Sequence, residues 1–305
     1  MRGATAAAGA AVLAAALSAS PATAEGPFGL QLEGSFGEGG FKNYRPPITN
    51  PIFNESPFIT TEVRPIYVYH DIPDDFVTGG GNVNVAAIQA RLAVNDRLGI
   101  IATTDGYSWL DFDNVLPDAD GWNDITVGVK YALISDPASG LIVTPGLRYT
   151  IPVGNIDTAG IDLNGHAGGY FNPFVSAAKI WDKMQLQGMV GANISFTDDG
   201  TSTFLAALHA DYEVLPGFYP MLEMNLFAPI DGGDQLAGPV LGKLTGADLF
   251  DLASDEPETI LTLGGGFRYA VTDNVMFGVG ADVNVLQDKD HVYGWRILTD
   301  LVVHF

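Results

Sequence analysis

The chain ends on YGWRILTDLVVHF, residues 293–305, and the alternating pattern of this stretch decides the fold class. Every second residue gives an apolar face that ends on an aromatic side chain: Tyr293, Trp295, Ile297, Thr299, Leu301, Val303 and Phe305. The face between them is mixed: Gly294, Arg296, Leu298, Asp300, Val302 and His304. Strict alternation predicts a β-strand, because successive side chains of a strand point to opposite faces of a sheet.

The composition excludes several other classes of protein. No run of about 20 apolar residues follows residue 24, so a membrane-spanning helix is not expected in the mature chain. The chain has no cysteine, which excludes a disulfide framework, a thiolate metal site and a cysteine nucleophile. A net charge of −22 argues against nucleic-acid partners, because these require a basic face.

The N-terminus predicts the compartment. Arg2 precedes a short run of small apolar residues, 6–17, and Ala22-Thr23-Ala24 follows. A charged start, a short apolar run and an A-x-A site are typical of a secretory signal peptide, so residues 1–24 are predicted to be removed after Ala24. An uncleaved anchor helix is disfavoured, because the run is shorter than a membrane span.

From residue 59 onward, alternating segments of about 11–13 residues follow one another between turn-forming residues. They comprise residues 59–70, 83–94, 98–110, 122–133, 141–153, 170–180, 184–196, 203–214, 219–229, 259–270, 275–286 and 293–305. A tilted strand needs about this length to cross the apolar core of a bilayer. Because single-chain bacterial barrels have an even number of strands, the pattern predicts an all-β fold, a transmembrane antiparallel up-and-down β-barrel of 12 strands.

The connections between these segments alternate in length. Short turns rich in Asn, Asp, Pro and Gly occupy residues 95–97, 134–140, 181–183, 215–218 and 271–274. The intervening connections are mostly longer: residues 71–82, 111–121, 154–169, 197–202, 230–258 and 287–292. Outer-membrane barrels have short periplasmic turns and longer outer loops, so the first strand is expected to run outward and Phe305 to end in the periplasm.

The polar faces of the segments separate a barrel from a β-sandwich. In residues 122–133, Ile125 and Val127 share one face, whereas Asp124 and Lys130 share the other. A sandwich also alternates, but its interior is dry and would not accept a full set of polar faces. Aromatic residues near many strand ends, predicted to form interfacial girdles, are Tyr67, Tyr69, Tyr131, Tyr149, Trp181, Phe196, Tyr212, Tyr219, Phe267, Tyr269, Tyr293 and Trp295.

Residues 25–58 lie outside this regular pattern. Apolar residues alternate over residues 28–36, which would fit a thirteenth strand, but an odd number is not expected of such a barrel. Residues 43–58, NYRPPITNPIFNESPF, contain four prolines and cannot form a central strand, because proline lacks the N–H that a ladder needs. The segment 25–58 is predicted either to lie in the periplasm or to fold into the lumen as a plug, and the sequence leaves both open.

Charged side chains on the predicted inner faces are nearly balanced in sign. The lumen-lining candidates are Glu62, Arg64, Arg91, Asp124, Lys130, Arg148, His209, Asp211, Glu213, Glu223, Arg268, Asp282, Arg296 and Asp300. Charges inside a barrel are tolerated where they pair or line water. A channel for acidic sugars would instead have a one-sided basic ladder, so the balance predicts a narrow, gated or filled pore, or a network that stiffens the barrel.

The predicted outer loops hold twenty Asp and Glu residues against two lysines. Such a mouth would attract cations, repel anions and share divalent ions with lipid phosphates, or it would act only as a solvated rim. The residues that resemble fragments of calcium loops are Asp111, Asp113, Asp118 and Asp120. They lack the closing Glu at the required distance, so they remain cation candidates and neither a metal site nor a cofactor is assigned.

Catalytic motifs are absent from the sequence, which has no G-x-S-x-G, H-E-x-x-H or Walker loop. The one group of residues that could suggest catalysis is His209, Asp211 and Glu213, which share one predicted inner face. A structural network explains these residues more simply than a catalytic site does. The chain is therefore not expected to be an enzyme.

Two predicted strands resemble those of a known family. GWNDITVGVKY, residues 121–131, and LRYTIPVG, residues 147–154, resemble the MetA-pathway phenol-degradation family of barrels, whose members carry a G-x-x-D-hydrophobic-lysine-aromatic strand and then a strand ending in Pro and Gly. The resemblance extends loosely over residues 59–305. It implies an outer-membrane barrel that passes small, often hydrophobic molecules, and it carries over no catalytic residues.

Together these patterns predict a channel or transporter in the outer membrane of a Gram-negative cell, for small molecules that include hydrophobic or aromatic ones. The alternative is a structural or adhesive surface barrel, and a remote one is a lipid-modifying barrel enzyme. The expected partners are outer-membrane lipid and lipopolysaccharide, a small-molecule solute, and the barrel-insertion machinery. The last follows from a resemblance, because bacterial barrels end on a C-terminal Phe that this machinery reads, as Phe305 would be here.

Overall fold

The computed structural model describes residues 30–42, 44–165, 168–238, 241–286 and 289–305, so the predicted signal peptide lies outside the described residues. The elements in chain order are η2 (Gly34–Phe36), β1 (Glu62–Ile72), β2 (Gly81–Ala93), β3 (Leu98–Phe112), β4 (Ala119–Trp122), β5 (Ile125–Tyr131), β6 (Ile134–Asp136), β7 (Leu141–Ile151), β8 (Asp157–Thr158), β9 (Ile161–Asp162), β10 (Tyr170–Trp181), β11 (Met184–Ser195), β12 (Ser202–Tyr212), β13 (Phe218–Asp231), η3 (Leu241–Lys243), β14 (Ile260–Ala270), β15 (Val275–Asn284) and β16 (Trp295–His304). None of the helices in the described part of the chain is long and apolar enough to cross a membrane.

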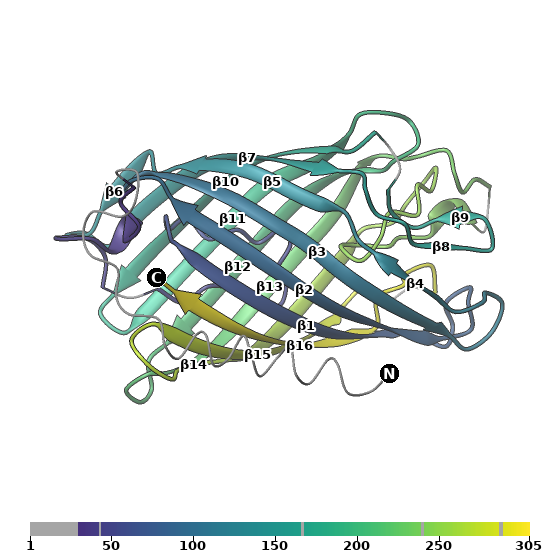
Figure 1. Cartoon of the computed structure of the whole chain (residues 1–305). Coiled ribbons are helices and arrows are strands. Elements are labelled where there is room, and N and C mark those ends of the chain that lie inside the picture. Colours follow the sequence, from purple (N-terminus) through teal and green to yellow (C-terminus); the bar gives the residue numbers. More distant parts are fainter. Residues whose placement is uncertain (1–29, 43, 166–167, 239–240, 287–288) are drawn as a thin grey trace.

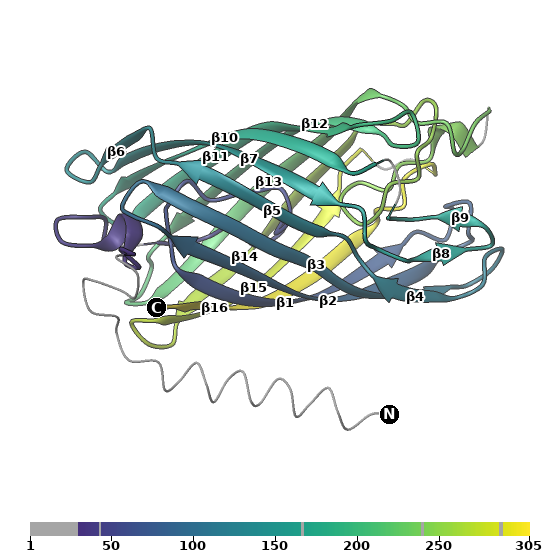
Figure 2. The same cartoon turned by 45° about the horizontal axis from the view of Figure 1, so that its top comes forward.

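Twelve of these strands pair into one closed antiparallel barrel, and Figures 1 and 2 show its arrangement. They pair in the order β1-β2-β3-β5-β7-β10-β11-β12-β13-β14-β15-β16, and β16 pairs back with β1, where Tyr67 lies opposite Thr299. The predicted 12-stranded all-β barrel is confirmed. Closure gives every barrel strand a neighbour on both sides, so no backbone edge is left unpaired along the wall.

Two short strands extend the wall beyond its ends. β4 pairs with β3 and β6 pairs with β7, outside the main path of the barrel. The predicted strand 122–133 is therefore too long, since the barrel strand covers only Ile125–Tyr131. Asn123 leaves the ladder because its side chain donates to Ser108 Oγ at 2.8 Å, and Asp124 leaves it to accept from Gly154 N at 2.8 Å.

The connections alternate in length as the sequence predicts. The short-turn end of the barrel carries residues 94–97, 132–140, 182–183, 213–217 and 271–274, and the long-loop end carries the other connections. Asp182 has a φ of 45°, which the two-residue turn between β10 and β11 requires. The chain also finishes at the short-turn end, where His304 N donates to Asn274 O at 2.8 Å.

The two faces of the strands differ as expected of a barrel with an apolar outside. Val129 is 49% exposed, whereas the next residue, Lys130, is 2% exposed and points inward. Two predicted girdle positions are wrong, because Tyr219 and Tyr293 are buried. Tyr293 precedes β16 and its hydroxyl donates to Asp282 at 2.8 Å, so the carboxylate holds the ring inside.

Candidate functional site

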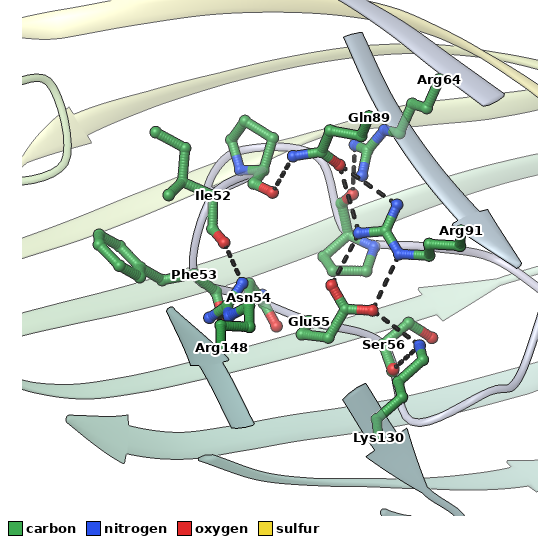
Figure 3. A network of polar contacts seen from close by, with 12 residues as sticks. Ile52, Phe53, Asn54, Glu55, Ser56, Arg64, Gln89, Arg91, Lys130 and Arg148 are labelled. Atoms are coloured by element: carbon green, nitrogen blue, oxygen red, sulfur yellow. Dashed lines mark hydrogen bonds and ion pairs between the residues drawn. The ribbon is translucent and has the colours of Figure 1, made fainter. Parts of the chain in front are cut away.

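Residues 44–58 run through the inside of the barrel and contact strands on opposite sides of its wall; we call them the inner segment (Figures 1 and 3). All are buried except Ile52 and Phe53, which are partly exposed. Residues 44–49, the first arm, bond to β11–β14, β16 and β1, whereas residues 51–58, the second arm, bond mainly to β2, β5 and β7. Residue 50 lies at the tip between the arms, on the side of the long-loop end.

Many of the bonds that hold the inner segment are made to its backbone carbonyl oxygens. Each donor side chain of the wall and its acceptor are Gln185 to Arg45 O, Arg268 to Pro46 O and Pro47 O, Arg64 to Pro47 O, Arg296 to Thr49 O, Gln89 to Pro51 O, Arg148 to Ile52 O and Phe53 O, Lys130 to Ser56 O, and Thr144 to Pro57 O. Prolines 46, 47, 51 and 57 have no N–H, so this segment offers more acceptors than donors. A wall rich in Arg and Gln supplies the missing donors.

The second arm carries one carboxylate, Glu55, that meets two cations of the wall (Figure 3). Arg91 donates to both of its oxygens, at 2.9 and 2.7 Å, and Lys130 Nζ lies 2.7 Å from Oε1. Arg91 also donates to Glu62 at 3.0 Å. The two predicted wall cations therefore share one acid of the inner segment, and Arg91 binds an acid of the wall as well.

The first arm lies over a second ionic group, formed around Asp300. Arg268 donates to both oxygens of Asp300, at 2.8 and 2.9 Å, and Arg64 donates to the same carboxylate. Both arginines also donate to the carbonyl of Pro47, at 2.7 Å from Arg64 and 3.0 Å from Arg268. One carboxylate thus orients two guanidinium groups toward the same carbonyl.

His209 lies between two carboxylates on adjacent strands. Its Nδ1 is 2.7 Å from Glu223 and its Nε2 is 2.8 Å from Asp211, with all three side chains fully buried. A neutral imidazole has a single N–H, so both bonds form only when the ring is protonated or a carboxyl holds the proton. Both ring nitrogens are occupied, which leaves neither to accept a proton from a nucleophile.

The carboxylates beside His209 extend this group to the first arm. Glu223 accepts from Ile48 N at 2.9 Å and from Thr49 N at 2.6 Å, while Asp211 pairs with Arg45 at 2.6 Å. Arg45 also lies 5.0 Å from the centre of the Tyr219 ring. The constellation predicted around His209 therefore binds the inner segment, with Glu223 in the place expected for Glu213.

Glycines in β14 and β15 allow the first arm to approach the wall closely. A Cβ on Gly280 would lie 2.5 Å from Ile48 Cγ2, and one on Gly278 would lie 3.0 Å from Ile48 Cδ1. On β14, a Cβ on Gly264 would lie 3.0 Å from Thr49 Cγ2. Because these glycines have no side chains, the wall has a shallow groove in which the arm lies.

Arg296 joins the wall, the inner segment and an outer loop. Its Nε lies 3.1 Å from Asp282, its Nη1 lies 2.8 Å from Asp248, and its Nη2 donates to Thr49 O. Its guanidinium also stacks 4.7 Å from the Tyr293 ring centre. Asp248 was expected in the acidic mouth, but it is buried in the lumen because Arg296 binds it.

Three further lumen candidates lie apart from these ionic groups. Arg148 donates to Asn172 at 2.7 Å and stacks 5.0 Å from the Phe174 ring. Asp124 lies near the long-loop end and holds a loop through Gly154 N. Glu213 is only partly buried in the turn after β12, where it accepts from Gly217 N at 3.1 Å.

The acidic mouth remains largely exposed. The four cation candidates Asp111, Asp113, Asp118 and Asp120 are all exposed, and Asp118 accepts locally from Phe112 N at 3.2 Å. Among the residues that the structure describes, no three His, Cys, Asp or Glu side chains converge as a metal would require. In the same mouth, the hydrogen bond from Lys243 to Glu258 at 3.1 Å raises the pKa of that lysine.

Sequence reasoning missed Arg45, Glu55 and Asp248 as members of the lumen network. Arg45 and Glu55 lie ahead of the first strand and Asp248 lies in a connection, so all three are outside the alternating strands from which inward side chains were inferred. The nearest signal for the inner segment is that residues 43–58 carry one base and one acid among four prolines. For Asp248 the sequence contains no signal, because Arg296 lies 48 residues away in the chain.

A cavity of about 160 Å³, which we call the chamber, lies between the tip of the inner segment and residues 244–252 of the long-loop end. Phe53, Ile66, Val68 and Phe227 form much of its apolar lining. Its polar lining residues include Asn123, Asp124, Thr150, Tyr170, Asn193 and Thr203. The chamber is thus a mainly apolar space with polar groups along part of its wall.

Comparison with known proteins supports the fold. No family model and no curated protein matches the chain. Among solved structures, the chain is similar to the COG4313 outer membrane channel from Pseudomonas putida F1, with a TM-score of 0.52 at 14% identity over 80% of this chain and 96% of that one. It is also similar to a NanC porin, with a TM-score of 0.51 at 10% identity over 81% of this chain and 100% of that one. The chain therefore has the fold of outer-membrane channels and porins.

Proposed function

We propose that this protein is an outer-membrane channel for small molecules and that the inner segment acts as its plug. The observation that carries the proposal is how the segment is attached. Its carbonyl oxygens accept from side chains such as Arg268 and Gln89, and the strands keep their own ladders. Such a segment can leave without breaking the barrel, because water can replace each of these bonds in an open lumen.

The solutes we propose are small and include apolar or aromatic molecules. The chamber of about 160 Å³ is close to the ~150 Å³ of an apolar protein cavity that binds benzene. Phe53 and Phe227 are among its lining residues. The resemblance of residues 121–131 and 147–154 to the phenol-degradation barrels points the same way.

The orientation follows from the connections. The short turns and Phe305 would face the periplasm, where the insertion machinery reads the last strand, and the long loops would face lipopolysaccharide outside. The exposed Asp residues of that mouth would repel anionic solutes and attract cations. A neutral or cationic solute is therefore favoured at entry.

Solute flux through refolded protein in liposomes tests the proposal. The full chain should conduct little, and a variant lacking residues 44–57 should conduct ions and admit small neutral solutes much faster. If neither form passes ions or solutes while both are inserted and folded, the channel function is wrong.

The orientation has its own test: single cysteines at Asp111 and Asp118 should react with a membrane-impermeant reagent on intact cells.

One observation favours the alternative of a structural barrel: the lumen is filled by paired charges such as those of Arg91 and Glu55. Under that alternative, removing the inner segment would lower stability without creating flux. A lipid-modifying activity would have to be lost in His209→Ala, although both nitrogens of that ring are already bonded to carboxylates.

A further inference from the structure

The long-loop end carries a second closing element above the chamber, residues 244–252, which we call the lid. Its buried Asp248 pairs with Arg296 at 2.8 and 2.9 Å from the two oxygens. Its Asp251 accepts from Thr201 N at 2.7 Å and from the Tyr170 hydroxyl. Besides backbone bonds such as that from Asp251 N to Leu163 O at 3.1 Å, two separate side-chain attachments therefore hold the lid, and only the first uses Arg296.

Arg296 contacts both closing elements at once. Its Nη1 donates to the lid at Asp248, its Nη2 donates to the inner segment at Thr49 O, and its Nε donates to Asp282 of the wall. The side chain of Arg296 is 2% exposed. Because a guanidinium is planar and its N–H directions are fixed, a partner at one nitrogen orients the donors at the others.

We propose that Arg296 couples the lid to the inner segment, so that each element stays closed more firmly while the other is closed. With Thr49 O in place, the guanidinium is held with Nη1 facing Asp248. When the inner segment leaves, that orientation is less fixed and a buried donor needs water. When the lid leaves, Arg296 loses one of its two ionic partners, keeps only Asp282, and has more freedom to turn away from Thr49 O.

The coupling rests on the proposed function only in assuming that both elements open in some state of the protein. Its consequence for a channel is that a solute need not push directly on the inner segment. The chamber lies between the two elements, and both Arg296 and Asp248 line it. A molecule that displaces the lid from outside would thereby loosen the inner closure.

The test measures the reactivity of two single cysteines in an otherwise cysteine-free chain. Phe250→Cys, at a buried position, reports on the lid, and Ile48→Cys, at a fully buried position, reports on the inner segment. Asp248→Ala should speed labelling at both reporters, by about 5-fold or more at Ile48→Cys. Asp251→Ala is the matched control: it should speed labelling at Phe250→Cys but affect Ile48→Cys far less than Asp248→Ala does, because Asp248 still pairs with Arg296 whenever the lid is closed.

The double variant Asp248→Ala with Arg296→Lys completes the cycle. Coupling requires that Asp248→Ala add nothing further at Ile48→Cys once Arg296 is lysine, because the three-way junction is already lost. Equal effects of Asp248→Ala and Asp251→Ala on Ile48→Cys, or no effect of either, would overturn the coupling. Neither result bears on the channel proposal, which stands or falls on flux after deletion of residues 44–57.

Discussion

Glu223 binds the first arm of the inner segment, and replacing it by glutamine should release that arm. Its Oε1 accepts from Ile48 N at 2.9 Å, and its Oε2 accepts from both Thr49 N, at 2.6 Å, and Thr49 Oγ1. Glutamine keeps one acceptor oxygen but places an NH2 donor where the other stood. In either orientation of the amide, its NH2 group faces a backbone N–H of the arm, that of Ile48 or that of Thr49, so two donors oppose each other.

The size of the effect follows from these contacts. A hydrogen bond to a charged acceptor contributes about 1.5–3 kcal/mol, and at least one such bond to the arm is lost while the rest become bonds to a neutral acceptor. A loss of ~3 kcal/mol is therefore expected for docking of the arm. Since ~1.4 kcal/mol corresponds to a tenfold change, the undocked fraction should rise roughly 100-fold.

Thiol labelling at Ile48→Cys measures this fraction, because Ile48 is fully buried while the arm is docked. Glu213→Gln is the control, since Glu213 makes the same kind of bond to Gly217 N in a turn. The reasoning is refuted if Glu223→Gln speeds labelling by less than ~3-fold, or no more than Glu213→Gln does. Longer open periods in single-channel recordings should accompany the faster labelling.

Three further changes have distinct expected outcomes. Gly280→Leu should expel Ile48, whose Cγ2 would lie 2.5 Å from the new Cβ, and raise single-channel conductance, whereas Gly188→Leu, beside Leu208, should not. Arg148→Met should remove the guanidinium donors from the carbonyls of Ile52 and Phe53, and so speed labelling at Ile52→Cys several-fold. Arg91→Met should destabilise the folded barrel by about 3–5 kcal/mol in urea titrations and Lys130→Met by less, because Arg91 alone binds both Glu55 oxygens.

The barrel could be predicted because its signal is local. Alternation between neighbours such as Val129 and Lys130 indicates which side chain faces the outside of the barrel and which faces the lumen. The alternating lengths of the connections then give the two ends. The balance of charge on the inner faces predicted a network, and in the structure Arg91 pairs with Glu62 and Arg268 pairs with Asp300.

The partners in that network could not be predicted, because they depend on which connections fold inward. In the sequence Asp248 is one more acid of a predicted outer loop, whereas in the structure it pairs with Arg296. Tyr293 fitted the lipid-facing pattern of the last strand, but the strand begins two residues later and Asp282 takes the hydroxyl. A periodic pattern carries no information on contacts of this kind, which cross the lumen between distant segments.

The chemistry of the inner segment would allow one set of wall residues to serve both the closed and the open state of the channel that we propose. Pro46 and Pro47 present carbonyl oxygens without competing N–H groups, so Arg64 and Arg268 can bind them and still bind Asp300. If the segment leaves, the ion pairs with Asp300 remain and only neutral carbonyls are exchanged for water. The part of the wall around Asp300 then needs no rearrangement of charge to become hydrated. Closure by carbonyl oxygens, which carry no net charge, is therefore easier to reverse than closure by the carboxylate of Glu55. If Glu55 leaves, Lys130 loses its paired charge.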